Sequence, residues 1–403
     1  MNILIIGHVW PEPSTTAAGK RMLQLVDAFL DFGYKITFGS TSSKTEFSYN
    51  FLSKGVDCVE LQLNNSSFDE FLMELHPEIV VFDRFMTEEQ FGWRVSDILP
   101  NTLRILNTED LHSLRKSREE KNLGGWKQHP MTLRELASIF RSDLTLMISM
   151  VEVELLVKEA AVPESLLMHL PFMLDIPTED EIKKWPSYKD RTDFVCIGNG
   201  KHAPNIHAIK TLKQEIWPLI RNEIPDAKLK IIGAYLPQQV LEMHKPKEGF
   251  EIMGWILNLD QVLQNARLLL APIEFGAGIK GKLTDAMCNG TPNITTAIGA
   301  EGMYDDMPWS GAISHNWEEF VHNAVRLYQN EMVWKEAQAN GFNIVSRVYS
   351  KDKHRTALKE RIKELHTSLT TFRNDNIIGR MLLQQGLAAT KYMGKWIEEK
   401  NRN

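Results

Sequence analysis

The feature that most constrains the fold is an alternation of short apolar runs with amphipathic helical stretches, which occurs twice along the chain. In the first part, the helical pattern is clearest over 20–33, which ends on Gly33. Nearly continuous, β-branched apolar runs between such helices are typical of parallel strands buried on both faces. The strands predicted here are 3–7, 34–40, 78–83, 102–107 and 143–149, with a further helix over 69–76.

The alternation stops near Pro171 and then begins again. The interruption holds three prolines and many charges, which is typical of a linker or hinge. A strand over 193–200 then enters a glycine turn, and Pro204 opens a helix over 204–220. Further strands are predicted over 227–233, 250–254, 266–272 and 291–296.

Two such halves predict an α/β protein with two Rossmann-like domains, each a doubly wound parallel sheet, facing a central cleft. The expected boundaries are 1–172 for the first, acceptor-side domain, 173–191 for the hinge, 192–368 for the second, nucleotide-sugar-binding domain and 369–403 for a helical tail that packs back on the first domain.

Composition excludes several classes of protein. A net charge of −6 argues against a general nucleic-acid binder, which needs a basic excess. Cys58, Cys196 and Cys288 lie far apart without C-x-x-C spacing, so we expect reduced core residues in a cytoplasmic protein. The opening MNILIIGHVW lacks a basic segment and predicts a buried strand, not a signal peptide. No run approaches the ~20 apolar residues of a membrane span.

The segment 274–290, EFGAGIKGKLTDAMCNG, is one residue away from a P-loop. A P-loop places Ser or Thr where this chain has Leu283, and that hydroxyl holds Mg²⁺. Thr284 comes one residue late, so on a helix it points about 100° away. A working ATPase is therefore disfavoured, no metal site is expected, and Leu283 is interpreted as a core residue of a short helix.

The same segment still has the chemistry of an anion site. Loop glycines let backbone N–H groups approach a phosphate, and the helix start adds the positive end of a dipole. Lys280 and Lys282 add full charges, which can stabilise a departing diphosphate without a metal. The alternative is a glycine-rich surface turn with solvated lysines.

The stretches 197–220 and 266–303 resemble the donor-binding half of retaining glycosyltransferases of the GT-B fold. The closest group is the "glycosyl transferases group 1" assembly, also called family 4, and within it a subgroup with a G-A-G-I-K-G-K loop. The resemblance is strong over 193–345 and weaker over 1–170.

This resemblance implies a donor site. Asp285, just before Ala-Met, inherits the ribose-binding role, whereas Ala277 stands where relatives carry a first glutamate. His202 and Asn205 match an H-x-P-N pattern. Lys201 is expected to bind the diphosphate, with a solvated loop lysine as the alternative. The segment 300–302 is expected to face the donor's sugar and phosphates, with an ordinary turn as the alternative. The implied donor-binding residues are Gly19, Lys201, Glu274 (as a secondary candidate), Gly276, Gly278, Ile279, Lys280, Lys282, Asp285, Ala300, Glu301 and Gly302.

The segment 104–122 is the candidate catalytic part of the first half. A strand ends at Asn107, and a polar turn then delivers Glu109, Asp110 and His112. By resemblance, His112 lines the reaction centre, where it can hydrogen-bond the sugar or acceptor while Asp110 orients it. The alternative is a helix-capping aspartate beside an exposed histidine.

Two further segments each have a purely structural and a functional interpretation. The basic cluster Arg115, Lys116, Arg118 and Lys121 is either a solvated helix face or a contact for an anionic acceptor or a membrane surface. The tail 377–403 is expected to be an amphipathic helix packed on the body. The alternative is membrane contact through Arg380, Lys391 and Lys395, which is disfavoured because Glu398 and Glu399 balance these charges.

These expectations combine into one hypothesis. The resemblance implies a retaining glycosyltransferase that takes a nucleotide-sugar as co-substrate, needs no metal or other cofactor, and acts on a glycan, a lipid-linked or a small-molecule acceptor in the cytoplasm, with peripheral membrane contact allowed. The alternatives are a sugar-nucleotide epimerase of the same fold and a non-catalytic nucleotide-sugar-binding module.

Overall fold

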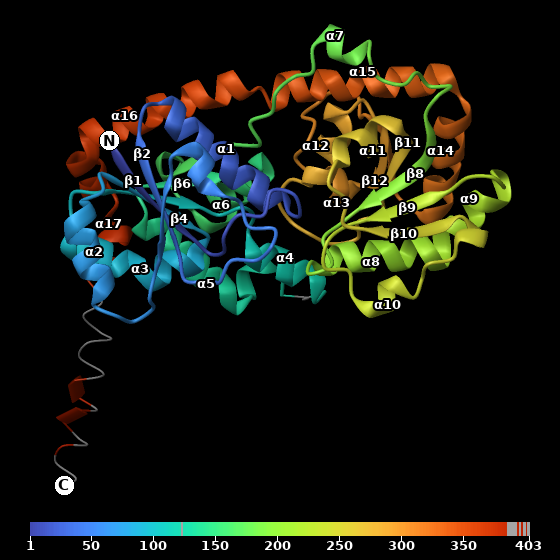
Figure 1. The fold of residues 1–403 in the computed structure, drawn as a ribbon. Helices are drawn as coiled ribbons and strands as arrows, with labels where there is room; N and C mark the ends of the chain where they lie inside the picture. Colours follow the sequence, from blue (N-terminus) through green and yellow to red (C-terminus); the bar gives the residue numbers. More distant parts are fainter. Residues whose placement is uncertain (122–123, 385–392, 395, 398–399, 401–403) are drawn as a thin grey trace.

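The computed structural model describes residues 1–121, 124–384, 393–394, 396–397 and 400. Within them the chain forms two all-parallel sheets, side by side in Figure 1. The first sheet has the order β3 (Asp57–Glu60), β2 (Lys35–Ser40), β1 (Asn2–Gly7), β4 (Ile79–Asp83), β5 (Leu103–Asn107), β6 (Leu144–Met147) and β7 (Leu167–His169). The second has β10 (Phe250–Gly254), β9 (Leu229–Ile232), β8 (Thr192–Ile197), β11 (Ala266–Ala271), β12 (Asn293–Thr296) and β13 (Gly311–Ser314).

Helices cover both faces of each sheet. On the first sheet, α1 (Ala17–Asp31) and α16 (Lys351–Asp375) pack on one face. The other face carries α2 (Ser67–Leu75), α3 (Phe85–Ile98), α5 (Pro130–Arg141) and α6 (Met150–Ala160). On the second sheet, α11 (Leu259–Asn265), α12 (Gly281–Cys288) and α15 (Glu331–Val348) face α8 (Ala203–Thr211), α9 (Trp217–Glu223) and α14 (Trp317–Gln329) across the strands. The remaining helices are α4 (His112–Glu119), α7 (Glu179–Ile182), α10 (Gln238–Leu241), α13 (Ala297–Ala300) and α17 (Ile377–Leu383).

The continuous apolar runs are explained by burial of each central strand on both faces. In β1, Ile3 and Ile5 belong to one core cluster and Leu4 to the other. Leu268 and Leu269 of β11 divide in the same way between the two cores of the second sheet. The predicted two-domain, doubly wound α/β fold is confirmed.

Several elements differ from the sequence prediction. The strands β3, β7 and β13 were not predicted, and the hinge contains a short helix, α7, with a capping box between Thr178 and Glu181. The T-x-x-E spacing was visible in the sequence. Cys58 is exposed on β3, which corrects its interpretation as a core residue, whereas Cys196 is buried as expected.

The chain crosses between the domains at two adjacent points. Leu174 N donates to Tyr349 O at 2.9 Å, and the Lys351 ammonium lies 2.9 Å from Asp175 Oδ1, so the outgoing and returning segments are tied together. Figure 1 shows α15 and α16 running end to end along both domains. The α16 residues Leu358 and Ile362 pack in the first core, although the sequence placed the return at residue 369.

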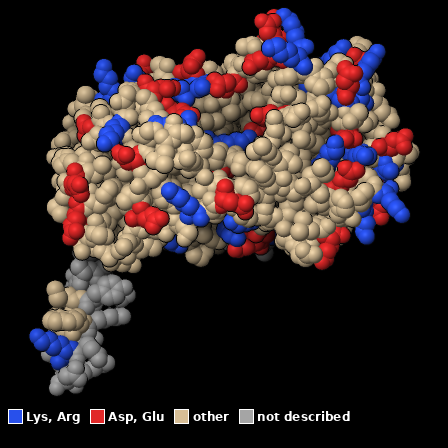
Figure 2. Space-filling model, in the orientation of Figure 1, with Lys and Arg blue, Asp and Glu red and all other residues tan. Residues whose placement is uncertain are grey.

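After α16, the helix α17 lies against the first domain, where Asn376 Nδ2 donates to Phe140 O at 2.8 Å. Lys391, Lys395, Glu398 and Glu399 lie outside the described residues. Figure 2 shows acidic and basic side chains interspersed on the visible face. In the part of the chain that the structure describes, no helix is long and apolar enough to cross a membrane.

Candidate active site

The carboxyl ends of the two sheets face a common cleft of about 520 Å³. In each sheet the strand order reverses beside the first strand, between β1 and β4 and between β8 and β11. Ligands of open α/β sheets bind outside the carboxyl ends at such switch points. The cleft is lined from both domains, mainly by residues within 9–22, 83–84, 109–115, 197–205, 232–235, 255–259 and 273–285.

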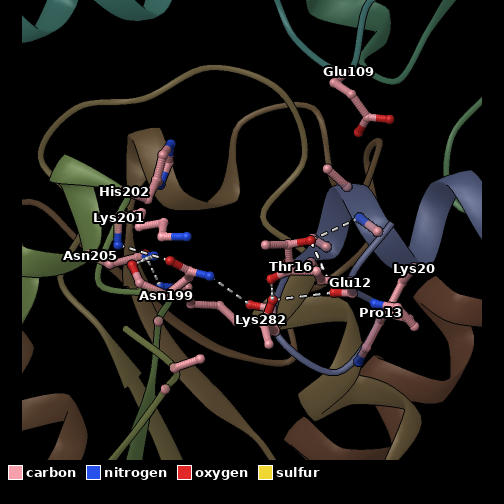
Figure 3. A pocket seen from close by; sticks show the side chains of 18 of the residues that line it. Glu12, Pro13, Thr16, Lys20, Glu109, Asn199, Lys201, His202, Asn205 and Lys282 are labelled. Carbon is pink, nitrogen blue, oxygen red and sulfur yellow. Dashed lines mark hydrogen bonds between the residues drawn. The ribbon is translucent and has the colours of Figure 1, made fainter. Parts of the chain in front are cut away.

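Most of the predicted site residues lie together in this cleft. Both catalytic candidates, Asp110 and His112, line it. The predicted donor residues that line it are Gly19, Lys201, Gly276, Gly278, Ile279, Lys280, Lys282 and Asp285. In Figure 3, Glu12, Thr16 and Lys20 of the first domain face Asn199, Lys201, His202 and Asn205 of the second across the pocket.

The predicted phosphate loop connects β11 to α12. Gly278 has a φ of +64°, which favours glycine, and Lys280 is the N-cap of α12 without a side-chain capping bond. Leu283 is fully buried in the second core, and the Thr284 hydroxyl donates to Gly281 O at 2.8 Å within the same helix. The start of α12 therefore brings Lys280, Gly281 and Lys282 to the lining of the cleft.

Lys280 and Lys282 are enclosed ammonium groups without ion-pair partners among the described residues. Lys280 is 8% exposed, and its Nζ donates to Gly278 O at 2.8 Å. The Nζ of half-buried Lys282 donates to Asn205 Oδ1 at 2.6 Å. Burial lowers both pKa values, that of Lys280 to about 8. Because an unpaired enclosed cation costs free energy, this arrangement is suited to receive an anion.

Asp285 forms an ion pair that crosses the cleft. Its Oδ2 lies 2.8 Å from Lys20 Nζ on α1. Burial opposes the charge of Lys20, but Asp285 outweighs it, so the pKa of the ammonium is raised. The sequence analysis missed Lys20, because a lysine after Gly19 in a first helical turn is indistinguishable from a solvated one.

A second polar bridge joins two residues of the cleft lining, one from each domain, and was also missed. The Tyr235 hydroxyl donates to Glu12 Oε1 at 3.0 Å across the two domains. Lys201 Nζ lies 3.5 Å above the Tyr235 ring, a cation–π contact that positions this lysine at the cleft. His202 is the N-cap of α8, and burial lowers its pKa to about 4, so the imidazole is uncharged.

The turn after β5 brings Asp110 and His112 together. His112 Nε2 lies 3.4 Å from Asp110 Oδ1, and Arg115 Nη1 donates a hydrogen bond to Asp110 Oδ2. Burial alone would raise the pKa of the Asp110 carboxyl. The positive charge of Arg115 and the proximity of His112 have a larger combined effect, so this pKa is lowered from its ordinary value. Burial lowers the pKa of His112 to about 3, so this imidazole is neutral. Glu135 Oε1 accepts from His112 N at 2.7 Å and fixes the start of α4.

Glu109, in the same turn, also lines the cleft. Its backbone φ is +64°, Asn107 Nδ2 donates to its Oε1 at 2.8 Å, and Arg21 lies 3.9 Å away. Burial raises the pKa of the carboxyl to about 7. Nothing in the spacing distinguished this glutamate from an ordinary turn residue.

Four predicted donor residues do not line the cleft. Glu274 is exposed on the outer side of the loop, where its Oε2 lies 3.5 Å from His207 Nε2. Ala300, Glu301 and Gly302 lie beyond the lining, and Glu301 is bound by Arg118. Ala277 lines the cleft and packs, half-buried, against the first-domain core.

The basic cluster on α4 is not a uniformly solvated face. Arg115 binds Asp110, and Arg118 crosses to the second domain, where it binds Glu301 and Gly276 O. Lys116 pairs with Glu119 on its own helix, at 2.8 Å. Two of the four basic side chains thus contact residues in or beside the cleft.

The fold and the cleft define a GT-B type of protein. Sucrose-phosphate synthase from Thermosynechococcus elongatus has a similar structure, with a TM-score of 0.70 at 14% identity, over 91% of this chain and 100% of that one. HepE from Anabaena, in complex with UDP and glucose, has a TM-score of 0.68 at 12% identity, over 90% of this chain and 99% of that one. Structural similarity at such low sequence identity shows a shared fold and nothing about activity.

The sequence comparisons cover a smaller part of the chain. Residues 191–330 match the family described as "Glycosyl transferases group 1". An "Uncharacterized 44.6 kDa protein in cps region" of Klebsiella pneumoniae is 25% identical over 170 residues, which is 40% of this chain and 43% of that protein. This match thus spans less than half of the relative's length. The family match and the fold together support a glycosyltransferase.

Proposed function

We propose that the protein transfers a sugar from a nucleoside-diphosphate sugar to a glycan, a lipid-linked or a small-molecule acceptor. The observation that carries this proposal is the pair of enclosed ammonium groups, Lys280 and Lys282, at the start of α12. Neither has an ion-pair partner among the described residues. A diphosphate would supply the missing negative charge beside the positive end of the helix.

The donor would lie with its diphosphate at Lys280 and Lys282 and its ribose at Asp285. The ribose hydroxyls would then replace Lys20 as hydrogen-bond partners of the Asp285 carboxylate. Because HepE is described in complex with UDP and glucose, a uridine nucleotide is the first donor class to test. Lys201, held at Tyr235, would add a cation at the other side of the phosphates.

We propose that transfer proceeds with retention and without a metal, as the resemblance implies. In that scheme the leaving diphosphate helps to deprotonate the acceptor hydroxyl, while the lysines and the helix start stabilise its charge. His112 would contribute a neutral imidazole, because burial lowers its pKa to about 3. Asp110, at 3.4 Å, would orient it.

The acceptor would enter over the first domain, near Gly19 and His112. We propose a cytoplasmic protein that works in polysaccharide biosynthesis, with peripheral contact to the inner face of the membrane where the acceptor is lipid-linked. The cps-region relative is the support for the pathway, and the exposed α17 residues Ile377, Ile378 and Met381 are the support for membrane contact.

A panel of nucleotide-sugars tests the proposed function. A bound donor should raise the melting temperature by mass action, and nucleotide should be released when a suitable acceptor is present. Analysis of the product anomer tests retention, and addition of a chelator tests independence of metal. Binding without release would favour the non-catalytic module, and conversion of the nucleotide-sugar into its epimer would favour the epimerase.

Donor affinity is expected to fall as the pH rises from about 7 to about 9. Burial lowers the pKa of Lys280 to about 8, so its positive charge is lost over this range. Burial also raises the pKa of Glu152 to about 8, so a negative charge develops beside the loop over the same range. Both changes weaken the binding of an anion.

Calorimetric titration with UDP at several pH values measures this effect. Lys280→Arg keeps its charge throughout, because the guanidinium pKa lies above about 12, and should show a shallower decline. A dissociation constant that stays flat in the wild-type protein would contradict the assignment of Lys280 to the phosphates.

A further inference from the structure

The phosphate loop of the second domain is held from the first domain at two points. Gly276 O accepts from Arg118 Nη1 at 2.8 Å, and Gly278 N donates to Glu152 Oε1 at 2.7 Å. Arg118 is on α4 and Glu152 is in the first turn of α6. Both helices belong to the first domain, so the loop that carries Lys280 is bound by the domain opposite its own.

Arg118 also binds a second loop of the same domain. Its Nη1 lies 2.7 Å from Glu301 Oε2 and its Nη2 lies 2.9 Å from Glu301 Oε1. A two-point bond between guanidinium and carboxylate is strong and directional. One side chain thus joins α4 to the loop after β11 and to the C-terminal end of α13.

Glu152 is enclosed between the domains. It is 1% exposed, and its Oε2 has no hydrogen-bond partner among the described residues. A side-chain carbon at Gly278 would lie 2.9 Å from Asp110 Cβ, so glycine is needed for this close approach. The Glu152 carboxyl accepts from Gly278 N at 2.7 Å, and the backbone of Leu111 in the first domain also acts to lower its pKa. A buried carboxyl that interacts with backbone groups of both domains is suited to join them.

The peptide that Glu152 holds also orients Lys280. Gly278 donates its N–H to Glu152 and accepts from Lys280 Nζ through its carbonyl, at 2.8 Å. Burial lowers the pKa of Lys280, and Glu301 and then Glu152 act in the opposite direction. The contacts from the first domain therefore influence both the position and the charge of this ammonium.

We infer that Arg118 and Glu152 are positioning residues that set the phosphate loop for the donor, through contacts that exist only while the two domains are closed on each other. Since α4 and α6 lie on the acceptor-side domain, closure and phosphate binding are then coupled. This inference rests on the proposed function. It assigns a role to Arg118 of the basic cluster, which the proposed function alone leaves unused.

The test measures the affinity of variants for nucleoside diphosphate. The probe is whichever of UDP, GDP, ADP and dTDP binds the wild-type protein most tightly in calorimetry. Arg118→Ala and Glu152→Ala should each raise its dissociation constant about tenfold, since each loses a hydrogen bond that orders the loop. Glu152→Gln keeps a carbonyl oxygen for Gly278 N and should stay within about threefold of the wild type.

Matched controls lie on the same two helices. Lys116→Ala removes a cation of α4 that pairs only with Glu119 among the described residues, and Glu154→Ala removes an exposed carboxylate of α6 that pairs with Lys158. Both should bind as the wild type does. If an alanine variant no longer unfolds cooperatively, Arg118→Met and Glu152→Leu replace it. Both keep the apolar part of the side chain while removing the hydrogen-bonding group, and the same loss of nucleotide affinity is expected.

The outcomes separate the inference from the proposed function. A wild-type protein that binds none of the four nucleotides would overturn the function itself. Wild-type binding together with unchanged affinity in the variants at Arg118 and Glu152 would overturn the inference alone. An equal loss in Glu152→Gln and Glu152→Ala would also overturn it, because the hydrogen bond to Gly278 would not be the cause.

Discussion

Replacing Lys280 and Lys282 together by alanine is expected to weaken nucleoside-diphosphate binding at least about 100-fold. Each ammonium would donate a charge-assisted hydrogen bond to phosphate, worth about 1.5–3 kcal/mol. Because about 1.4 kcal/mol changes a binding constant tenfold, two lost bonds account for this factor or more. Both side chains lie at the start of α12, so the variant removes both of the cations that this end of the helix brings to the cleft.

The same double variant should fold normally. Lys280 is 8% exposed without an ion-pair partner among the described residues, and removing a buried unpaired cation removes a desolvation cost. At position 282 the variant loses the bond to Asn205 Oδ1, which is the one hydrogen bond of the Lys282 side chain to the described residues. The melting temperature without ligand should therefore stay unchanged or rise, whereas the increase on adding UDP should disappear.

Calorimetry with UDP, GDP, ADP and dTDP decides the question, with Lys228→Ala as the matched control. Lys228 has a 52% exposed side chain, pairs with Glu251 at 3.3 Å and does not line the cleft. An unchanged affinity in the double variant would show that the loop does not bind the diphosphate. An equal loss in the control would show that only the overall charge matters.

The central strands were predictable because burial on both faces leaves a strong pattern. Leu4 and Ile5 are neighbours in β1 yet belong to different cores, so every position in the run must be apolar. The edge strand β3 (Asp57–Glu60) has one neighbouring strand and mostly exposed side chains, so its sequence resembles a loop. The strand β13 is also at an edge, and its half-buried GAIS sequence is too short and mixed to stand out.

The part of the site that lies on one continuous segment was also predictable. Glycines, two lysines and Asp285 follow a strand and enter a helix, and these local features need no knowledge of the second domain. The outward direction of Glu274 could not be predicted, because a loop without periodic structure gives no rule for which side chains face the cleft. Glu274 lies only six residues before Lys280 in the sequence, yet its carboxylate lies 3.5 Å from His207 Nε2 and away from the cleft.

Contacts between the domains were beyond sequence reasoning for a different reason. The pairs Lys20–Asp285 and Arg118–Glu301 join residues more than 180 positions apart, as their separations of 265 and 183 show. Which faces meet depends on the relative placement of two rigid sheets, set by the hinge and by α16. A sequence reveals that Arg118 is basic, and only the assembled cleft reveals that it holds a loop of the other domain.

Replacing His112 by alanine is expected to lower kcat about 100-fold while leaving the dissociation constant of the donor nucleotide within about threefold. His112 lies at the start of α4 in the first domain, whereas Lys280 and Lys282 lie at the start of α12 in the second. A positioned hydrogen-bond donor to developing charge is worth about 10²–10³ in kcat. Since burial lowers the pKa of His112 to about 3, its effect comes from a neutral imidazole and not from a cation.

Steady-state transfer and nucleotide calorimetry on the same variant measure the two quantities separately. The pH profile of kcat above about 5 should keep its shape in His112→Ala, because a group with a pKa of about 3 does not titrate there. His112→Gln retains an N–H donor and should recover part of the lost rate. Phe85 packs edge-on to the ring at 5.6 Å, so the melting temperature is the check on packing. Equal losses in kcat and in nucleotide affinity would place His112 outside the reaction centre and leave Asp110 without a side chain to orient.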